Sequence, residues 1–306
     1  IFLVNVPIGI AAVILGLKVI PRVRKSDEKN RMDWTGAATS FLALALFVFA
    51  VHSGHRLEWN SPVIIGCFAA SAVFAFLFVV NERRSEHPLV HPGLFSNRNY
   101  TLAALALIPS FMTTSGILFI FPLFLEIARH LSAQTSGLML ISLAAGQLAG
   151  PYVGHLSDRF GARRILLAGM SGSVVSFIWM ITLGTESPAP VILASLFFAG
   201  LVMGFEKAPN VQLAISQVPV KNRGVAGGTL GVFRSVGILM GLLFFERIFS
   251  LSIHAGSTLA PHQMTLNAID PSMAATGFRA VMIFGLSMRL VAIALILSMK
   301  GRRDSR

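Results

Sequence analysis

At residues 154–166 the chain reads GHLSDRFGARRIL. This polar strip lies between two apolar runs, at about 133–156 and 164–184, and each run is long enough to cross the ~30 Å hydrocarbon layer of a bilayer. Asp158 and three arginines therefore fall in a short connection between two predicted membrane spans. This arrangement is typical of a polytopic α-helical membrane protein.

The composition agrees with a membrane protein. Hydrophobic residues make up 54% of the 306 residues, and charged residues make up 12%, about half the fraction in a typical soluble domain. We predict an all-α fold, because a transmembrane barrel would show alternating segments of about ten residues, which the sequence lacks. Pro109 and Pro122 predict a kink or tilt in the fourth span. The predicted spans lie at about 1–20, 34–51, 61–80, 100–126, 133–156, 164–184, 190–216, 224–246 and 278–299.

The net charge of +12 follows the predicted topology. Of the 25 Lys and Arg residues, 17 fall in alternate connections and the C-terminal tail, against 4 in the other connections. The positive-inside rule places the basic side in the cytoplasm, so residue 1 starts outside and the C-terminus lies inside. The charge therefore indicates membrane topology rather than nucleic-acid binding. Cys67 is the only cysteine, so no disulfide within the chain is expected.

The polar strip predicts a gating contact. Gly154 and Gly161 are expected to bracket a tight turn, since glycine tolerates unusual backbone angles. Asp158 would accept hydrogen bonds from free amides at a helix start and pair with an arginine, which would hold two helices, or two bundles, in one conformation. The alternative is a basic loop that sets topology without gating. The residues assigned to this gating turn are Gly154, Asp158, Arg159, Gly161, Arg163 and Arg164.

The spacing G-x-L-x-D-R-x-G-x-R-R resembles the cytoplasmic signature loop of the major facilitator superfamily, in its second-half copy. It departs from that pattern at Ala162, where a basic residue is common. Further stretches resemble the 14-helix drug:proton antiporter family of the EmrB/QacA type. They are IFLVNVPIG at 1–9, MDWTGA at 32–37, EHPLVHPGLF at 86–95 and NRGVAGGTLGVFRSVGILMG at 222–241.

The resemblance implies a domain organisation. The chain starts inside an apolar run without Met, and we expect a fragment that covers helices six to fourteen of the family. Residues 1–20 would be the last helix of the N-terminal bundle, and 21–98 two linking helices with cytoplasmic loops. Residues 99–299 would form the C-terminal six-helix bundle, and 300–306 a cytoplasmic tail.

The resemblance also implies a function. We expect no enzyme and no cofactor, but proton-coupled efflux of drugs or other small molecules across a bacterial inner membrane by alternating access. A uniporter or symporter for another solute, and a truncated membrane protein without transport, are the alternatives. The expected partners are a small-molecule substrate, protons and the lipid bilayer, without nucleic acid. A periplasmic adaptor protein is left open.

Three ionisable residues within predicted spans are candidates for substrate contact or proton coupling: Glu206, Lys207 and Arg234. Glu206 and Arg234 each lie about ten residues from the cytoplasmic end of their helix, which is ~15 Å deep. We predict that they pair, or that Glu206 lines a cavity and takes a proton. A structural ion pair away from the transport path is the alternative. Lys207 is expected to contact substrate or line a wet cleft.

Weaker substrate-cavity candidates are Glu126, Asn210 and Gln212. The last two follow Pro209, which interrupts helix hydrogen bonding and can expose carbonyls to a cavity. Glycines at four-residue spacing predict close helix packing, either static or sliding. These glycines are Gly146, Gly150, Gly227, Gly231, Gly237 and Gly241. No metal site is expected, since neither His52 with His55 nor His87 with His91 has Cys or paired carboxylates nearby.

Overall fold

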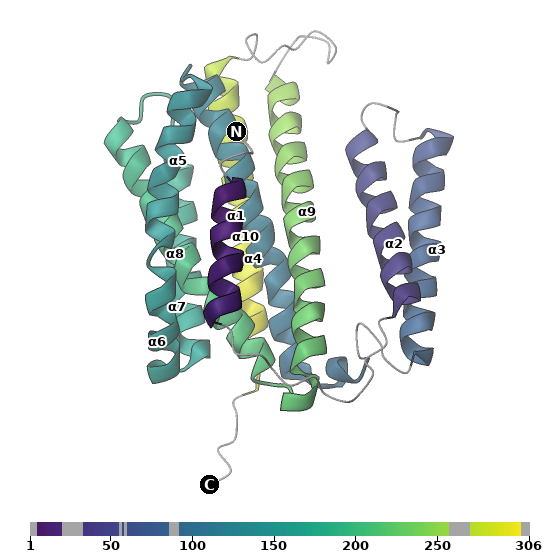
Figure 1. Cartoon of the computed structure of the whole chain (residues 1–306). Coiled ribbons are helices and arrows are strands. Elements are labelled where there is room, and N and C mark those ends of the chain that lie inside the picture. Colours follow the sequence, from purple (N-terminus) through teal and green to yellow (C-terminus); the bar gives the residue numbers. More distant parts are fainter. Residues whose placement is uncertain are drawn as a thin grey trace.

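A computed structural model describes residues 5–19, 33–54, 57, 60–85, 92–256 and 270–300. Regular structure in these ranges is entirely helical, which confirms the predicted all-α class (Figure 1). Several regions on which predictions were made lie outside the described residues. They are the basic stretch 20–32, part of the outer connection at 257–269, the tail 301–306, and His55, His87 and His91.

Each of the nine predicted spans coincides with apolar helical structure in the described part of the chain. Seven helices are long and apolar enough to cross a membrane, and Gly9–Val19 and Trp34–Ala50 form shorter apolar segments. The α-helices are α1 (Asn5–Val19), α2 (Trp34–Ser53), α3 (Pro62–Arg84), α4 (Arg98–Leu123), α5 (Ala133–Gln147), α6 (Gly150–Phe160), α7 (Ala162–Ile181), α8 (Ala189–Ile215), α9 (Arg223–Gly256) and α10 (Pro271–Leu297).

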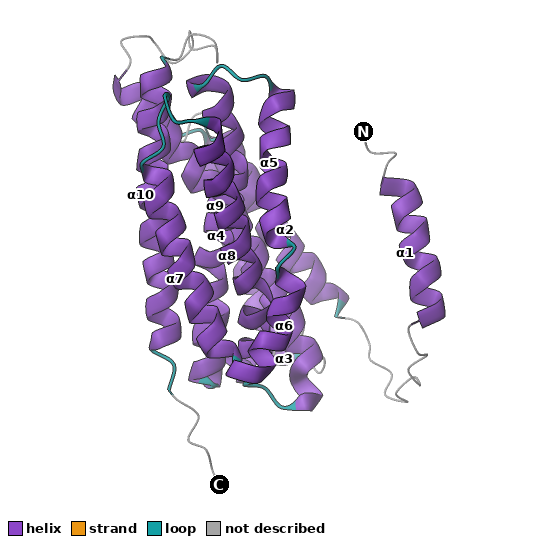
Figure 2. Ribbon diagram, turned by 90° about the vertical axis from the view of Figure 1, so that its left-hand side faces the viewer, coloured by secondary structure: helices purple, strands orange, loops and turns teal. Residues whose placement is uncertain are grey.

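Helices α4 to α10 pack into one bundle (Figures 1 and 2). Helix α4 packs against α9 and α10, while α8 packs against α5 and α7, and α10 also contacts α7 and α9. Helices α2 and α3 form a hairpin beside α9 (Figure 1). Figure 2 draws α1 apart from the bundle.

Polar residues cap the helix starts and so explain where several spans begin. Asp33 Oδ1 accepts a hydrogen bond from the Gly36 amide at 2.7 Å, which satisfies one of the free amides at the start of α2. Its other oxygen accepts from Asn81 Nδ2 at 2.7 Å and so ties α2 to the end of α3. The Gly36 amide is the main reason that the pKa of Asp33 lies below its ordinary value, and desolvation opposes it.

The fifth predicted span consists of two helices. Helix α5 ends at Gln147 and α6 begins at Gly150. Pro151 lies in the first turn of α6 and has no amide hydrogen, so the carbonyl of Gln147 cannot receive the usual bond from four residues later. Ala133–Phe160 nevertheless remains one candidate membrane span, as the sequence predicts, with an interruption at Leu148 and Ala149.

The polar strip is also helical rather than a loop. Helix α6 continues to Phe160 and α7 begins at Ala162, so the chain reverses at Gly161, whose φ is +88°. Few side chains other than glycine adopt this backbone angle. Gly154 lies inside α6 and not in the turn. The prediction that two glycines bracket a loop is thus wrong for Gly154, because no residue between it and Gly161 breaks the helix.

The buried core of the bundle contains a polar layer between two apolar clusters. One cluster holds aromatic side chains such as Phe121, Phe177 and Phe278, and the other surrounds Tyr100 and Leu107. Along four helices the chain passes from one cluster to the other through a buried polar residue. These residues are Ser110 in α4, Ser173 in α7, Glu206 in α8 and Arg289 in α10.

Candidate substrate cavity and gating turn

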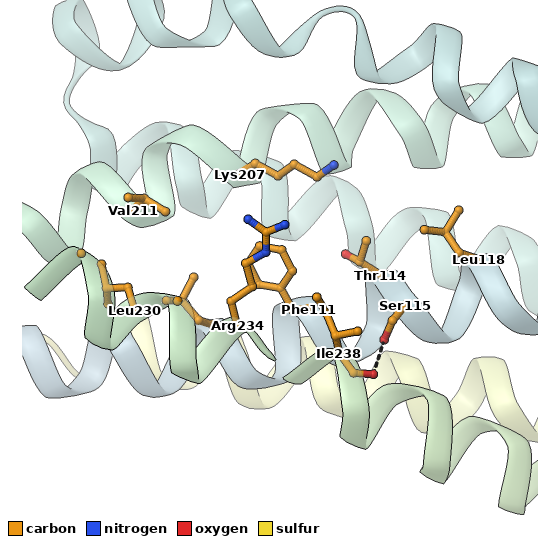
Figure 3. Close-up of a pocket in the computed structure, with 12 residues that line it drawn as sticks. Phe111, Thr114, Ser115, Leu118, Lys207, Val211, Leu230, Arg234 and Ile238 are labelled. Atoms are coloured by element: carbon orange, nitrogen blue, oxygen red, sulfur yellow. Dashed lines mark hydrogen bonds between the residues drawn. The ribbon is translucent and has the colours of Figure 1, made fainter. Parts of the chain in front are cut away.

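A cavity of about 460 Å³ opens among α4, α8 and α9 (Figure 3). Its volume falls within the range of about 300–1,000 Å³ that small-molecule sites occupy. The wall is mainly apolar, with a few polar groups that can orient a ligand. The lining residues are Leu107, Phe111, Thr114, Ser115, Leu118, Lys207, Val211, Gly227, Leu230, Gly231, Arg234 and Ile238.

Two cations face this cavity from different helices. Lys207 Nζ on α8 donates a hydrogen bond to Gln147 Oε1 at the end of α5, at 2.5 Å. The Arg234 guanidinium on α9 lies over the Phe111 ring, with its Cζ atom 5.2 Å from the ring centroid, at cation–π distance. Figure 3 shows the Arg234 head directed toward α8, on which Lys207 lies. The sequence prediction that Lys207 lines a cleft agrees with this position.

Helical spacing explains which residues reach the cavity. Lys207 and Val211 are four residues apart and share one face of α8. Glu206 is rotated about 100° from Lys207, so its side chain points into the bundle core. On α4, the Ser115 hydroxyl donates to the Ile238 carbonyl at 3.0 Å, which joins α4 to α9 beside the cavity (Figure 3).

Glu206 pairs with Arg289 rather than with Arg234. The Arg289 guanidinium donates to one Glu206 carboxylate oxygen, and the Ser173 hydroxyl donates to the other. The predicted pair with Arg234 is wrong, because Glu206 and Lys207 point to different sides of α8 and Arg234 shares the cavity with Lys207. Nor does Glu206 line the cavity, since it is buried in the polar layer between α7, α8 and α10.

Neither Asn210 nor Gln212 lines this cavity, although both were predicted to do so. Val211 takes that position, because successive residues on a helix point in different directions. Asn210 is buried, and Gln212 Nε2 donates to Asp158 Oδ1 at 2.9 Å. Glu126 is half-buried in a π-helical turn, Phe124–Ala128, and does not line the cavity either.

The gating turn makes contacts to two other helices. Asp158 on α6 accepts a hydrogen bond from the side-chain amide of Gln212 on α8. The predicted partners, which were backbone amides at a helix start and an arginine, are therefore wrong. Arg163 Nη2 on α7 donates to the carbonyls of Ile296 and Leu297 at 3.1 and 3.0 Å. A cation at the last carbonyls of α10 satisfies groups that the helix leaves unpaired and complements its dipole.

The remaining arginines of the turn lie at the surface. The Arg159 guanidinium is 5.3 Å from the ring centroid of Phe160, and Arg164 is exposed. The turn therefore fixes α6 to α8 through Asp158 and α7 to α10 through Arg163, while Arg159 and Arg164 supply charge at this end of the bundle.

The predicted packing glycines divide into two groups. A Cβ atom on Gly146 would lie 2.6 Å from the Leu201 amide nitrogen, and one on Gly237 would lie 2.6 Å from the Ile108 carbonyl oxygen. Gly241 likewise faces the backbone at Met112, and a Cβ on Gly150 would meet only Gly204, at an ordinary contact of 3.6 Å. Gly146 lies where α5 crosses α8, Gly150 where α6 meets α8, and Gly237 and Gly241 where α4 crosses α9.

Gly227 and Gly231 do not pack against another helix in the described residues. A Cβ atom on either would meet no atom within 4 Å, and both line the cavity. The packing prediction is wrong for these two, because this face of α9 borders open space. They shape the cavity rather than a helix contact.

Some residues of the site were not singled out from the sequence. Phe111, Thr114 and Ser115 look like ordinary residues of an apolar span, and Gln147 stands at a helix end that periodicity did not reveal. Arg289 carried a usable signal, because a charge within a span needs a partner. Its partner Glu206 depends on the arrangement of helices distant in sequence.

The profile of the Major Facilitator Superfamily matches residues 1–242. The chain belongs to the Major Facilitator Superfamily. This is a superfamily of membrane transporters rather than enzymes. Membership confirms the resemblance seen in residues 154–166. It also means that the chain is a multi-pass membrane protein.

Curated relatives in the superfamily match most of the chain at modest identity. The riboflavin transporter RibZ of Clostridioides difficile is 27% identical over 263 residues, which is 86% of this chain and 56% of RibZ. The multidrug resistance protein Stp of Mycobacterium tuberculosis is 29% identical, covering 86% of this chain and 48% of Stp. The drug efflux pump JefA of the same species is 26% identical, covering 89% and 53%. The chain thus spans about half the length of these relatives.

Proposed function

We propose that the chain is part of a proton-coupled antiporter that exports drugs or other small molecules by alternating access. The observation that carries this proposal is the cavity among α4, α8 and α9, which combines apolar walls with two cations. Relatives named as a multidrug resistance protein and a drug efflux pump support the efflux direction. Alternating access moves two helical bundles around a central site, and this cavity would be one bundle's share of it.

In this proposal α4 to α10 form the second six-helix bundle, in which α5 and α6 together make one span. Helix α1 is the last helix of the first bundle, and α2 and α3 link the two bundles. The rest of the first bundle comes from chain beyond these 306 residues, in line with the coverage of about half of each relative.

The orientation in the membrane follows from the charge distribution. With 17 of the 25 Lys and Arg residues in alternate connections and the tail, the Gly161 turn faces the cytoplasm of a bacterial cell. There the Asp158–Gln212 and Arg163–α10 contacts hold the cytoplasmic ends of the helices together. We expect these contacts to change when the carrier moves between its two states.

A second function has support of its own. The riboflavin transporter RibZ matches the chain at an identity similar to that of the drug exporters. A dedicated carrier for one solute, working as a uniporter or symporter, is therefore the alternative.

Flux measurements on the longer protein in proteoliposomes separate these functions. Antiport predicts that an imposed pH gradient drives a drug-like dye against its concentration gradient, with counterflow of protons, and that collapsing the gradient stops it. Equilibrating flux that ignores the pH gradient would indicate a uniporter, and flux in the same direction as protons would indicate a symporter. No flux of any tested solute would contradict a transport function.

A further inference from the structure

In the part of the chain that the structure describes, the cavity wall carries two positive charges and no negative charge. None of the described residues that line it is Asp or Glu. Lys207 is bonded to the neutral amide of Gln147, and Arg234 lies over the neutral ring of Phe111. The nearest carboxylate in sequence, Glu206, is occupied by Arg289 and Ser173 on the other side of α8. Both charges on the cavity wall are therefore left uncompensated by protein carboxylates in the described residues.

Two uncompensated cations at this depth are unfavourable by themselves. Charges within a membrane span are costly, and like charges on one cavity wall repel each other. An anion between them would remove both penalties. A guanidinium has several N–H donors in one plane and can bind two oxygens at once, and an ammonium can donate a further hydrogen bond from another side. Together they suit carboxylate, phosphate or sulfonate groups.

The remaining residues of the cavity wall indicate which kind of molecule would carry the anionic group. Leu107, Leu118, Val211, Leu230 and Ile238 give the cavity an apolar surface. Such a surface binds a hydrocarbon or aromatic body and would not favour a small hydrated inorganic ion. Gly227 and Gly231 leave space on the α9 side, where any larger side chain would reduce the volume.

We propose that the cavity binds an amphiphilic organic anion, with the acid group between Lys207 and Arg234 and the apolar body against α4 and α9. This inference rests on the proposed function and deepens it by naming the substrate class. It separates this carrier from exporters of lipophilic cations, because a cation placed here would meet two charges of its own sign.

Binding of two dyes with the same three-ring frame tests the charge preference. Fluorescein is anionic and rhodamine 123 is cationic, and fluorescence anisotropy measures their binding to the purified chain in nanodiscs and to the longer protein. We expect fluorescein to bind at least tenfold more tightly. Lys207→Gln and Arg234→Gln should each weaken fluorescein binding about tenfold or more, the usual effect of losing a hydrogen bond to a charged group.

Matched variants separate the loss of charge from the loss of fold. Lys207→Arg and Arg234→Lys keep the charge and should retain most of the fluorescein binding. Arg98→Gln removes an exposed cation outside the cavity and should leave it unchanged. Thermal unfolding of every variant shows whether the protein is intact. Rhodamine 123 binding equal to or tighter than fluorescein, failure of the folded protein to bind fluorescein, or unchanged affinity in both charge-removing variants would overturn the proposal.

The longer protein tests whether carboxylates elsewhere neutralise the cavity. If they do, fluorescein will bind to it no better than rhodamine 123, and the proposal fails. The flux assay gives a separate answer: fluorescein binding that depends on Lys207 and Arg234, without flux, would contradict the transport function and leave the ligand class standing. Flux restricted to cations would leave transport standing and contradict the ligand class.

Discussion

The guanidinium of Arg289 donates to the carboxylate of Glu206 in the middle of the bundle, where the two side chains are 0% and 6% exposed. This pair joins α8 to α10, and Ser173 adds α7. Two consequences follow, one for stability and one for transport.

Removing one member of the pair should destabilise the bundle strongly. Glu206→Gln or Arg289→Met leaves a buried group without its partner, which typically costs about 3–5 kcal/mol. The double variant Glu206→Met with Arg289→Met buries no charge and should recover most of that loss. Unfolding by heat or SDS titration in detergent measures all three. Single variants as stable as the parent would show that the pair contributes little.

The same pair should not carry the transported proton. Because Glu206 is held by Arg289 and Ser173 away from the cavity, Glu206→Gln is expected to reduce the amount of folded longer protein but to retain pH-driven flux per folded molecule. The flux assay, normalised to folded protein, checks this. Complete loss of pH dependence in well-folded Glu206→Gln would instead assign the coupling role to Glu206.

The turn between α6 and α7 depends on one glycine. Gly161→Ala should destabilise the protein by about 1–3 kcal/mol, because φ is +88° there and an alanine would be strained although space is open. Gly154→Ala is the matched control: it lies within helix α6 with no atom within 4 Å of an added Cβ. It should be neutral or stabilise by up to about 1 kcal/mol. Equal thermal stability of the two variants would refute this assignment of the turn.

The crossing of α4 and α9 depends on Gly237. An added Cβ would lie 2.6 Å from the Ile108 carbonyl oxygen, so Gly237→Ala should cost about 1–3 kcal/mol through overpacking. Gly231→Ala, on the same helix but facing the cavity, should leave the thermal unfolding temperature nearly unchanged. The packing of these two helices would be misassigned if Gly231→Ala proved the more harmful substitution.

Acid should weaken the α2–α3 hairpin through Asp33. The Gly36 amide lowers the pKa of this carboxyl below its ordinary value of 3.8, so the ionised form is favoured in the folded state. Its contribution to stability is therefore complete above pH 3.8 and is lost as the pH falls through the lower folded pKa. The shift of the Gly36 amide resonance with pH measures that pKa.

Asn at this position keeps an oxygen that can cap the helix but does not titrate. Asp33→Asn should therefore abolish the acid dependence of the Gly36 resonance while retaining the helix start. If the resonance of Asp33→Asn moved with pH as it does in the parent protein, another group would be responsible.

The sequence was a good guide to features set by local chemistry. Span positions follow from the length of apolar runs, and the strip around Gly161 carries enough spacing information to indicate the superfamily. The position of Lys207 in a cleft also followed from its charge, because a charged side chain within a membrane span is stable only beside water or a binding partner.

Features that depend on contacts between distant helices were harder to predict. Judged only by its depth in the membrane, Arg234 was as good a partner for Glu206 as any other cation. Glu206 and Lys207 are neighbours in sequence but point to different sides of α8, so Glu206 meets Arg289 while Lys207 shares the cavity with Arg234. Gly231 and Gly237 have the same spacing pattern, but one faces a cavity and the other a helix. The bond between Gln212 and Asp158 joins residues 54 positions apart, beyond any local pattern.

Binding and transport as proposed require the cavity to be a water-filled part of the transport path. Cys67 is the only cysteine, so Cys67→Ser provides a background in which single cysteines can be placed. Thr114→Cys lies in the cavity, and Ile178→Cys lies on the exposed apolar surface of α7, where lipid would cover it. The measurement is the rate at which a membrane-impermeant anionic methanethiosulfonate modifies each variant in nanodiscs. A water-filled cavity should give rapid modification of Thr114→Cys and little of Ile178→Cys, whereas a Thr114→Cys variant modified no faster than Ile178→Cys would show that water does not reach the cavity.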